Sequence, residues 1–225
     1  MHIPDGYLSP QTYVPLYIVF IACMGAAIKK VKQKMSLKLI PFMGMASAFS
    51  FLIMMFNIPI PGGSSGHAIG AGLIALILGP WVAVVSVSVA IVLQAFIFSD
   101  GGITAIGANC FNMAVVIPFV AYGVFKITRG KSQSPVRINI AAFLAGYISL
   151  CIGAIVTAIE LGIQPLIAVS PEGQSLNSPY SLSIALPVMA IENLLVFGIV
   201  EGLLTTLLFT YFYQNNKYFI EVLKH

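Results

Sequence analysis

Charged side chains are scarce in this sequence. Only 8% of the 225 residues are Asp, Glu, Lys or Arg, and 59% are hydrophobic, whereas a soluble domain carries roughly 25% charged residues. The shortage excludes a soluble enzyme, a nucleic-acid-binding protein and a disordered chain. At roughly 20 residues per crossing, the apolar content fills about six to eight membrane helices. We therefore expect a single membrane-embedded domain over residues 1–225, crossing the cell membrane several times.

Cysteine and phosphate-binding motifs are also in short supply. Cys23, Cys110 and Cys151 lie in separate apolar runs, and none belongs to a Cys-x-x-Cys pair. Their odd number and wide spacing argue against a disulfide framework or a thiolate metal cluster, so we assign them packing roles. The glycine-rich stretch at residues 62–66 lacks the Lys-Ser or Lys-Thr pair of a phosphate loop, so we expect no nucleotide site.

Long apolar runs make up most of the chain. Six have the character of membrane crossings: Thr12–Ile28, Leu37–Phe56, Trp81–Phe98, Ile103–Phe125, Ile138–Leu161 and Ser183–Phe212. A shorter run, Ala68–Leu78, precedes Gly79-Pro80 and would form about 16 Å of helix. This run is either a short crossing that ends at the Gly-Pro turn or the first part of a kinked helix that continues to Phe98.

The basic residues distinguish these two arrangements. If Gly79-Pro80 is a tight cytoplasmic turn and the N-terminus lies outside, all eleven Lys and Arg residues fall on the cytoplasmic side. The kinked helix would place six of them outside, against the positive-inside tendency. We therefore predict an all-α integral membrane protein with seven transmembrane helices, its N-terminus outside and its C-terminus in the cytoplasm. The short crossing must then be shielded by neighbouring helices.

A few polar or small residues interrupt the apolar runs. Gly44 and Ala48 form a small-xxx-small pair that lets two helix backbones approach closely, either within this bundle or at a docking face for a partner membrane subunit. Glu192 and Glu201 lie in the last run, where an intramembrane carboxylate is a candidate functional group. They are about 13 Å apart along a helix, which is too far for a carboxylate dyad.

Only three histidines occur, and two of them fall on the predicted outer side. His225 is the last residue, whereas His2 follows Met1 and His67 ends the loop after the second run. Met1 should be retained, because removal of the initiator methionine generally needs a small second residue and His2 is bulky. The turn sequence Pro4-Asp5-Gly6 can fold the terminus back toward the bundle, and the glycines before His67 allow a close backbone approach.

The position of His2 gives it a distinct chemistry. The Met1 α-amine, the His2 backbone nitrogen and the His2 Nδ1 can bind one metal ion through a five-membered and a six-membered chelate ring. They leave one equatorial position, for which His67 has the only other imidazole on that side. Such an all-nitrogen site favours Ni(II) or Cu(II), and loss of the amide proton makes affinity rise with pH. Alternatively, His2 is a frayed terminal residue and His67 has only a structural role in its loop, and neither binds metal. The residues by themselves leave both interpretations open.

Five stretches of the sequence resemble one family. Residues 1–8, 59–67, 78–80, 93–95 and 100–109 read MHIPDGYL, PIPGGSSGH, LGP, LQA and DGGITAIGAN. They are similar to the CbiM/NikM family, the substrate-binding membrane components of cobalt and nickel energy-coupling-factor transporters. The stretches follow the family order through most of the first half of the chain, and after about residue 130 only the topology is compatible.

The resemblance implies a site, a substrate and partners. The metal would be bound by the Met1 amine, the His2 amide and imidazole, and the His67 imidazole. The substrate would be Ni(II), slightly favoured by the planar nitrogen set, or Co(II). Energy would come from a transmembrane coupling subunit and cytoplasmic ATPase subunits, with a small extra membrane subunit often associated. Residues that would hold the metal ligands in position through hydrogen bonds are Asn109, Asn112, Ser64, Ser65, Asp5 and Gln94.

Two other functions compete with metal capture. One is an intramembrane hydrolase that uses Glu192 or a metal-bound water, which would need an open coordination position. The other is a passive metal or proton channel, which should have polar residues along every crossing. The stretches Ile74–Leu78 and Val82–Val85 are wholly apolar, which argues against a channel. We therefore expect a transport component that is not an enzyme.

Overall fold

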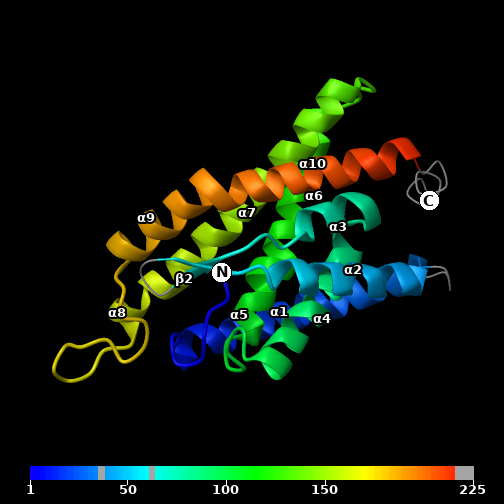
Figure 1. Cartoon of the computed structure of the whole chain (residues 1–225). Coiled ribbons are helices and arrows are strands. Elements are labelled where there is room, and N and C mark those ends of the chain that lie inside the picture. The colour runs from blue at the N-terminus through cyan, green and yellow to red at the C-terminus, as the bar shows by residue number, and fades with distance from the viewer. Residues whose placement is uncertain (35–38, 61–63, 216–225) are drawn as a thin grey trace.

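The computed structural model describes residues 1–34, 39–60 and 64–215, most of which are helical (Figure 1). The helical class predicted from the composition is confirmed. The α-helices are α1 (Pro10–Lys34), α2 (Leu39–Met54), α3 (Ala71–Leu78), α4 (Pro80–Phe98), α5 (Ile106–Cys110), α6 (Ile117–Arg129), α7 (Pro135–Gly162), α8 (Gln164–Ile167), α9 (Leu182–Glu192) and α10 (Gly198–Asn215). Two π-helical segments, η1 (Phe111–Val116) and η2 (Asn193–Phe197), join α5 to α6 and α9 to α10.

One short hairpin departs from the predicted all-helical pattern. Strands β1 (Ile58–Ile60) and β2 (Ser64–Gly66) pair antiparallel, with Ile58 opposite Gly66. Three residues per strand are too few for the alternation of apolar and polar residues that marks a strand in a sequence. The hairpin matters for the site because β2 ends one residue before His67.

Five helical segments are long and apolar enough to cross a membrane. They are Pro10–Gln33, Pro80–Phe98, Ile106–Arg129, Pro135–Ile167 and Leu182–Asn215, and α2 is a shorter apolar helix. All six long apolar runs of the sequence therefore correspond to helices. The predicted run Ile103–Phe125 begins too early, because its first three residues form the turn that precedes α5. That turn is held by the N-terminal segment, as described below.

The short apolar run forms a helix of its own at the centre of the bundle. Helix α3 ends at Leu78, and Gly79 adopts a φ of 89° before α4 begins at Pro80. This positive φ is readily available to glycine, and it breaks the helix. Residues 71–77 are all buried, because α4, α6, α7 and α10 pack around α3. The expectation that neighbouring helices shield this segment is confirmed.

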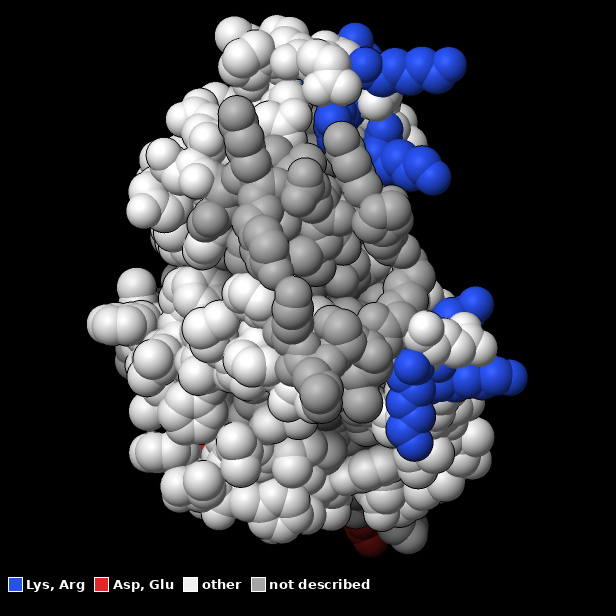
Figure 2. Space-filling model, turned by 90° about the vertical axis from the view of Figure 1, so that its right-hand side faces the viewer, with Lys and Arg blue, Asp and Glu red and all other residues white. Residues whose placement is uncertain are grey.

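The N-terminal segment runs inward before α1 begins. Figure 1 shows the N-terminus near the middle of the molecule, and Met1 and Ile3 are 2% and 0% exposed. The described basic residues, by contrast, lie toward the surface. Figure 2 views the molecule from the right-hand side of Figure 1 and shows Lys and Arg side chains in two groups along its right edge. Described basic residues follow the apolar part of α1 and flank the α6–α7 connection.

Candidate metal centre

The side chain of Asn109 on α5 ties down the buried N-terminal segment. Its Oδ1 accepts a hydrogen bond from the Ile3 N–H at 2.8 Å, and its Nδ2 donates to the Ile3 carbonyl at 3.1 Å. The Gly102 N–H donates to the same carbonyl at 2.8 Å. Asn109 is 1% exposed, so these bonds form away from water and are costly to leave unmade. They fix the backbone one residue after His2.

Asp5 makes the second attachment of this segment. Its carboxylate accepts hydrogen bonds from the Ile103 and Thr104 N–H groups at 3.0 and 2.8 Å, and from the Thr104 hydroxyl at 2.5 Å. These bonds to the charged form lower the pKa of Asp5. The predicted supporting role of Asp5 therefore has a structural counterpart in the loop between α4 and α5, rather than at a histidine ring.

Two glycines in that loop leave room for the terminus. A Cβ on Gly102 would collide with the Asp5 backbone nitrogen and lie 2.7 Å from the Pro4 carbonyl carbon. Gly101 has a φ of +89°, and a Cβ there would come within 3.0 Å of His2 Nδ1. The expected close approach at the glycines before His67 involves Gly62 and Gly63, which lie outside the described residues, and Gly101 and Gly102 were not expected to have this role. The Gly-Gly doublet directly after Asp100 was the available signal.

The structure brings the two predicted histidine ligands together. The ring centroids of His2 and His67 are 5.0 Å apart, with the ring planes at 42°. His67 Nδ1 lies 3.1 Å from the Ala68 carbonyl oxygen, and donation to this oxygen leaves the lone pair on Nε2. His67 Nε2 and both ring nitrogens of His2 are buried without a hydrogen-bond partner in the described part of the chain. Buried imidazole nitrogens normally have a partner, so this pair has the character of a ligand site.

The electrostatics keep these donors neutral. Burial lowers the pKa of the Met1 α-amine to about 6, although the charges of Glu192 and Asp100 oppose the shift. Burial, followed by the charge of the amine, lowers the pKa of His2 to about 3 and lowers the pKa of His67 well below its usual range. At pH 7 the nitrogen lone pairs are therefore available to a metal ion. If the amine and the imidazoles were protonated, their burial would be costly, because a positive ion loses its hydration when it leaves water.

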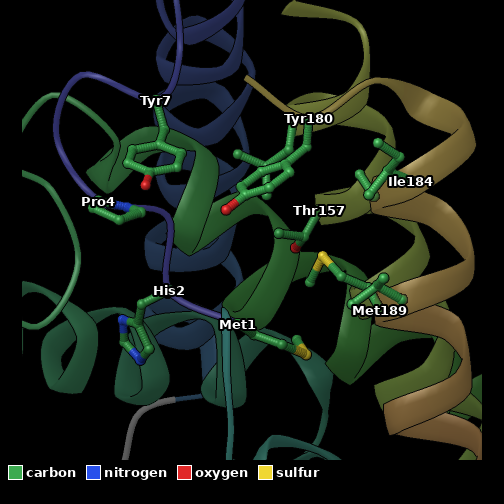
Figure 3. Close-up of a pocket in the computed structure, with 11 residues that line it drawn as sticks. Met1, His2, Pro4, Tyr7, Thr157, Tyr180, Ile184 and Met189 are labelled. Carbon is green, nitrogen blue, oxygen red and sulfur yellow. The ribbon is translucent and has the colours of Figure 1, made fainter. Parts of the chain in front are cut away.

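A cavity of about 60 Å³ lies beside the N-terminus. Figure 3 shows Met1 and His2 at one end of it and the rings of Tyr7 and Tyr180 at the other, with Met189 of α9 along the side. A volume of this order holds no more than a few water molecules. A hydrated ion would have to lose water to pass through it.

Among the described residues, the side chains of Asn112 and Gln94 form their hydrogen bonds with groups other than the histidine rings. Asn112 donates to Glu160 Oε2 at 2.7 Å and to the Thr157 hydroxyl at 3.1 Å, and Thr157 lines the cavity. Gln94 donates to the Phe51 carbonyl at 3.2 Å, so it joins α4 to α2. Ser64 and Ser65 lie in β2, and their side chains fall outside the described part of the structure.

The candidate donor set combines two side-chain imidazoles with two backbone nitrogens. Among the described residues, no group of three or more His, Cys, Asp and Glu side chains could hold a metal ion. The Met1 amine and the His2 amide complete the candidate donor set. Gly44 and Ala48 are exposed on α2, and a Cβ on Gly44 would meet nothing within 4 Å among the described residues. The choice between packing inside the bundle and docking of a partner stays a prediction.

Comparison with known proteins finds relatives that are metal transport proteins. It is 44% identical over 217 residues to the fused nickel transport protein NikMN of Rhodobacter capsulatus, covering 96% of this chain and 62% of the relative. It is 32% identical over 222 residues to the cobalt transport protein CbiM of Thermosipho melanesiensis, covering 96% and 88%. The chain thus spans about three fifths of the fused nickel relative and most of the cobalt relative.

Solved structures agree with this relationship. A crystal structure of a truncated transition metal transporter superposes with a TM-score of 0.90 at 45% identity, covering 95% of this chain and 98% of that one. These relatives are transport proteins, so the hydrolase alternative is not supported and the expectation of a non-enzyme is confirmed. Together with the spanning helices, they identify a multi-pass membrane protein. The model of the cobalt uptake substrate-specific transmembrane region matches residues 2–218, and the chain belongs to this CbiM family.

Proposed function

We propose that this chain is the substrate-capture membrane component of an ATP-driven importer of the energy-coupling-factor type, with Ni(II) or Co(II) as its substrate. The observation that carries the proposal is the pair of buried imidazoles, His2 and His67, whose nitrogens His2 Nδ1, His2 Nε2 and His67 Nε2 have no hydrogen-bond partner among the described residues. The nickel and cobalt transport relatives support the choice of metals. The chain has no phosphate-loop motif, so ATP would be hydrolysed by partner subunits.

In the proposed site the metal is bound by four nitrogens. The Met1 α-amine, the deprotonated His2 amide and the His2 imidazole form a planar chelate, and His67 Nε2 supplies the fourth donor. A planar all-nitrogen set favours Ni(II) over Co(II). Asn109 and Asp5 hold the backbone of the chelating segment, and such supporting groups change metal affinity about 10- to 100-fold. The proposal requires that the mature chain begins at Met1, which intact-mass measurement can check.

We further propose seven crossings, with the N-terminus outside. The separate helix α3 and the break at Gly79 support this count, as do the basic side chains gathered on one side in Figure 2. The site would then open toward the outer side through the cavity between Tyr7 and Tyr180. Protease accessibility of the α6–α7 connection in oriented vesicles tests this topology.

Metal selectivity tests the site itself. Protein purified without added metal is incubated with an equimolar mixture of Ni, Co, Cu and Zn, and the bound metals are quantified. We expect nickel to exceed cobalt and zinc, with the absorption of a square-planar four-nitrogen complex. The variant His67→Ala should bind weakly and lose that absorption. Cobalt alone in the protein would contradict the nickel preference, and unchanged binding by His67→Ala would contradict the site.

A further inference from the structure

A short buried segment carries His67 between the hairpin and helix α3. Residues 66–70 are buried throughout, and the ring of His67 is tied to this backbone through the Ala68 carbonyl oxygen. The direction of the imidazole therefore follows the path of the backbone. Whatever holds residues 66–70 in place also sets where His67 Nε2 points.

The carboxylate of Glu201 on α10 holds the downstream end of this segment. Its Oε2 accepts a hydrogen bond from the Ile69 N–H at 2.8 Å, and both oxygens accept from the Gly70 N–H, at 3.0 and 3.2 Å. Glu201 is 0% exposed. A carboxylate inside a membrane segment is costly and needs partners. Here the N–H groups ahead of helix α3 are the partners, and negative charge is favourable at that end of a helix.

Phe197 holds the upstream end from the same helical face. It lies four residues before Glu201, so the two side chains project from neighbouring turns. A Cβ on Gly66 would collide with the Phe197 ring, so the ring lies directly against the backbone of residue 66. The contacts of Phe197 and Glu201 thus fall on either side of His67. From α2, the Ser50 hydroxyl donates to the Ile69 carbonyl at 2.9 Å.

We infer that Glu201 is a positioning residue for metal capture, and that it acts by fixing the backbone from which His67 reaches the metal. The inference rests on the proposed function, because it assumes that His67 is a ligand. Glu201 does not itself bind the metal, since its oxygens are directed to the N–H groups of Ile69 and Gly70. Helix α10 is remote from the N-terminus in sequence, and through Glu201 it becomes part of the capture site.

The test is a double-mutant cycle between Glu201 and His67, measured by Ni(II) titration of the full chain. Glu201→Gln keeps the size of the side chain but replaces an acceptor oxygen with a donor that faces the backbone N–H groups. We expect about a 10- to 100-fold loss of Ni(II) affinity and a weakened square-planar absorption. If Glu201 acts only through His67, Glu201→Gln should cause no further loss in the His67→Ala background.

Thr205→Val is the matched control. Thr205 is buried one turn further along α10, and its hydroxyl has no hydrogen-bond partner among the described residues. Valine has nearly the same shape, so Ni(II) affinity should stay unchanged. If Glu201→Gln does not fold, Phe197→Leu tests the same idea from the other contact. Phe197→Leu should also lower the Ni(II) affinity, and it should cause no further loss in the His67→Ala background.

The outcomes separate this inference from the proposed function. Normal affinity in a folded Glu201→Gln variant, together with weak binding by His67→Ala, would overturn the role of Glu201 alone. Additive losses in the double variant would also overturn it, because Glu201 would then act on another part of the site. Unchanged binding by His67→Ala would instead overturn the proposed site.

Discussion

Adding two glycines in front of Met1 should abolish high-affinity metal binding. The change converts the Met1 α-amine into an amide and moves His2 to the fourth position, where the amine, the amides and the imidazole no longer form one planar four-nitrogen set. The added residues also have no room, because Met1 is 2% exposed and Ile3 is 0% exposed. One residue spans roughly 3.3–3.6 Å of chain, so the segment would have to leave its hydrogen bonds to Asn109.

The size of the effect follows from the donor count. Four-donor structural zinc sites gain about 10–16 kcal/mol on binding, or roughly 3 kcal/mol for each donor. At about 1.4 kcal/mol per tenfold, losing the amine by itself lowers affinity by about 100-fold. Losing the adjacent chelate rings makes the deficit larger.

Isothermal titration with Ni(II) measures this difference on two matched proteins. One carries the two glycines after a cleavable leader, and the other carries the same residues at its C-terminus. The C-terminal form should bind normally, and protease removal of the complete N-terminal extension, which regenerates Met1, should restore binding. Equal affinity in the two extended forms would refute the amine as a ligand and leave His67 as the centre of a different site.

Three further predictions concern pH, the loop and docking. Ni(II) binding should release about one proton at pH 8, from the His2 amide, and about two below pH 6, because the pKa of the Met1 amine is about 6 and a protonated amine must lose its proton before it binds. Calorimetry in buffers of different protonation enthalpy counts these protons, and a count independent of pH would contradict the scheme. Gly102→Ala should weaken Ni(II) binding, because the new Cβ meets the backbone of Asp5. Gly25→Ala, where a Cβ meets nothing within 4 Å, should bind normally in the same titration. Replacing Gly44 or Ala48 with Leu should block co-purification with the coupling subunit and transport while Ni(II) binding survives. Loss of binding as well would show that α2 serves the bundle instead.

The positions of most helices could be predicted from the order of residues. The long apolar runs coincide with helices because a segment in lipid must satisfy its own backbone hydrogen bonds. Boundaries were less accurate where tertiary contacts compete. Ile103 is as apolar as the helix that follows, yet its N–H donates to Asp5, which is 98 positions away in the chain. The hairpin and the π-helical segments also left no recognisable pattern in the sequence.

The two candidate histidine ligands also differ in how far the sequence predicts them. His2 next to an α-amine has a local chelating geometry that depends only on covalent bonds, so the sequence indicated it without a fold. His67 could be paired with it only by elimination and by resemblance, since no local rule brings residues 2 and 67 together.

By itself, the sequence determined that this chain lies in a membrane and is helical, and it indicated one candidate chelating terminus, because hydropathy and covalent connectivity are properties of neighbouring residues. The tertiary structure decided which distant groups support that terminus. Asn109 at Ile3, Gly102 against Asp5, and Glu201 at Ile69 are contacts across 106, 97 and 132 positions of the chain. Such contacts depend on how the helices pack, and packing places side chains according to shape and burial rather than according to their order in the sequence.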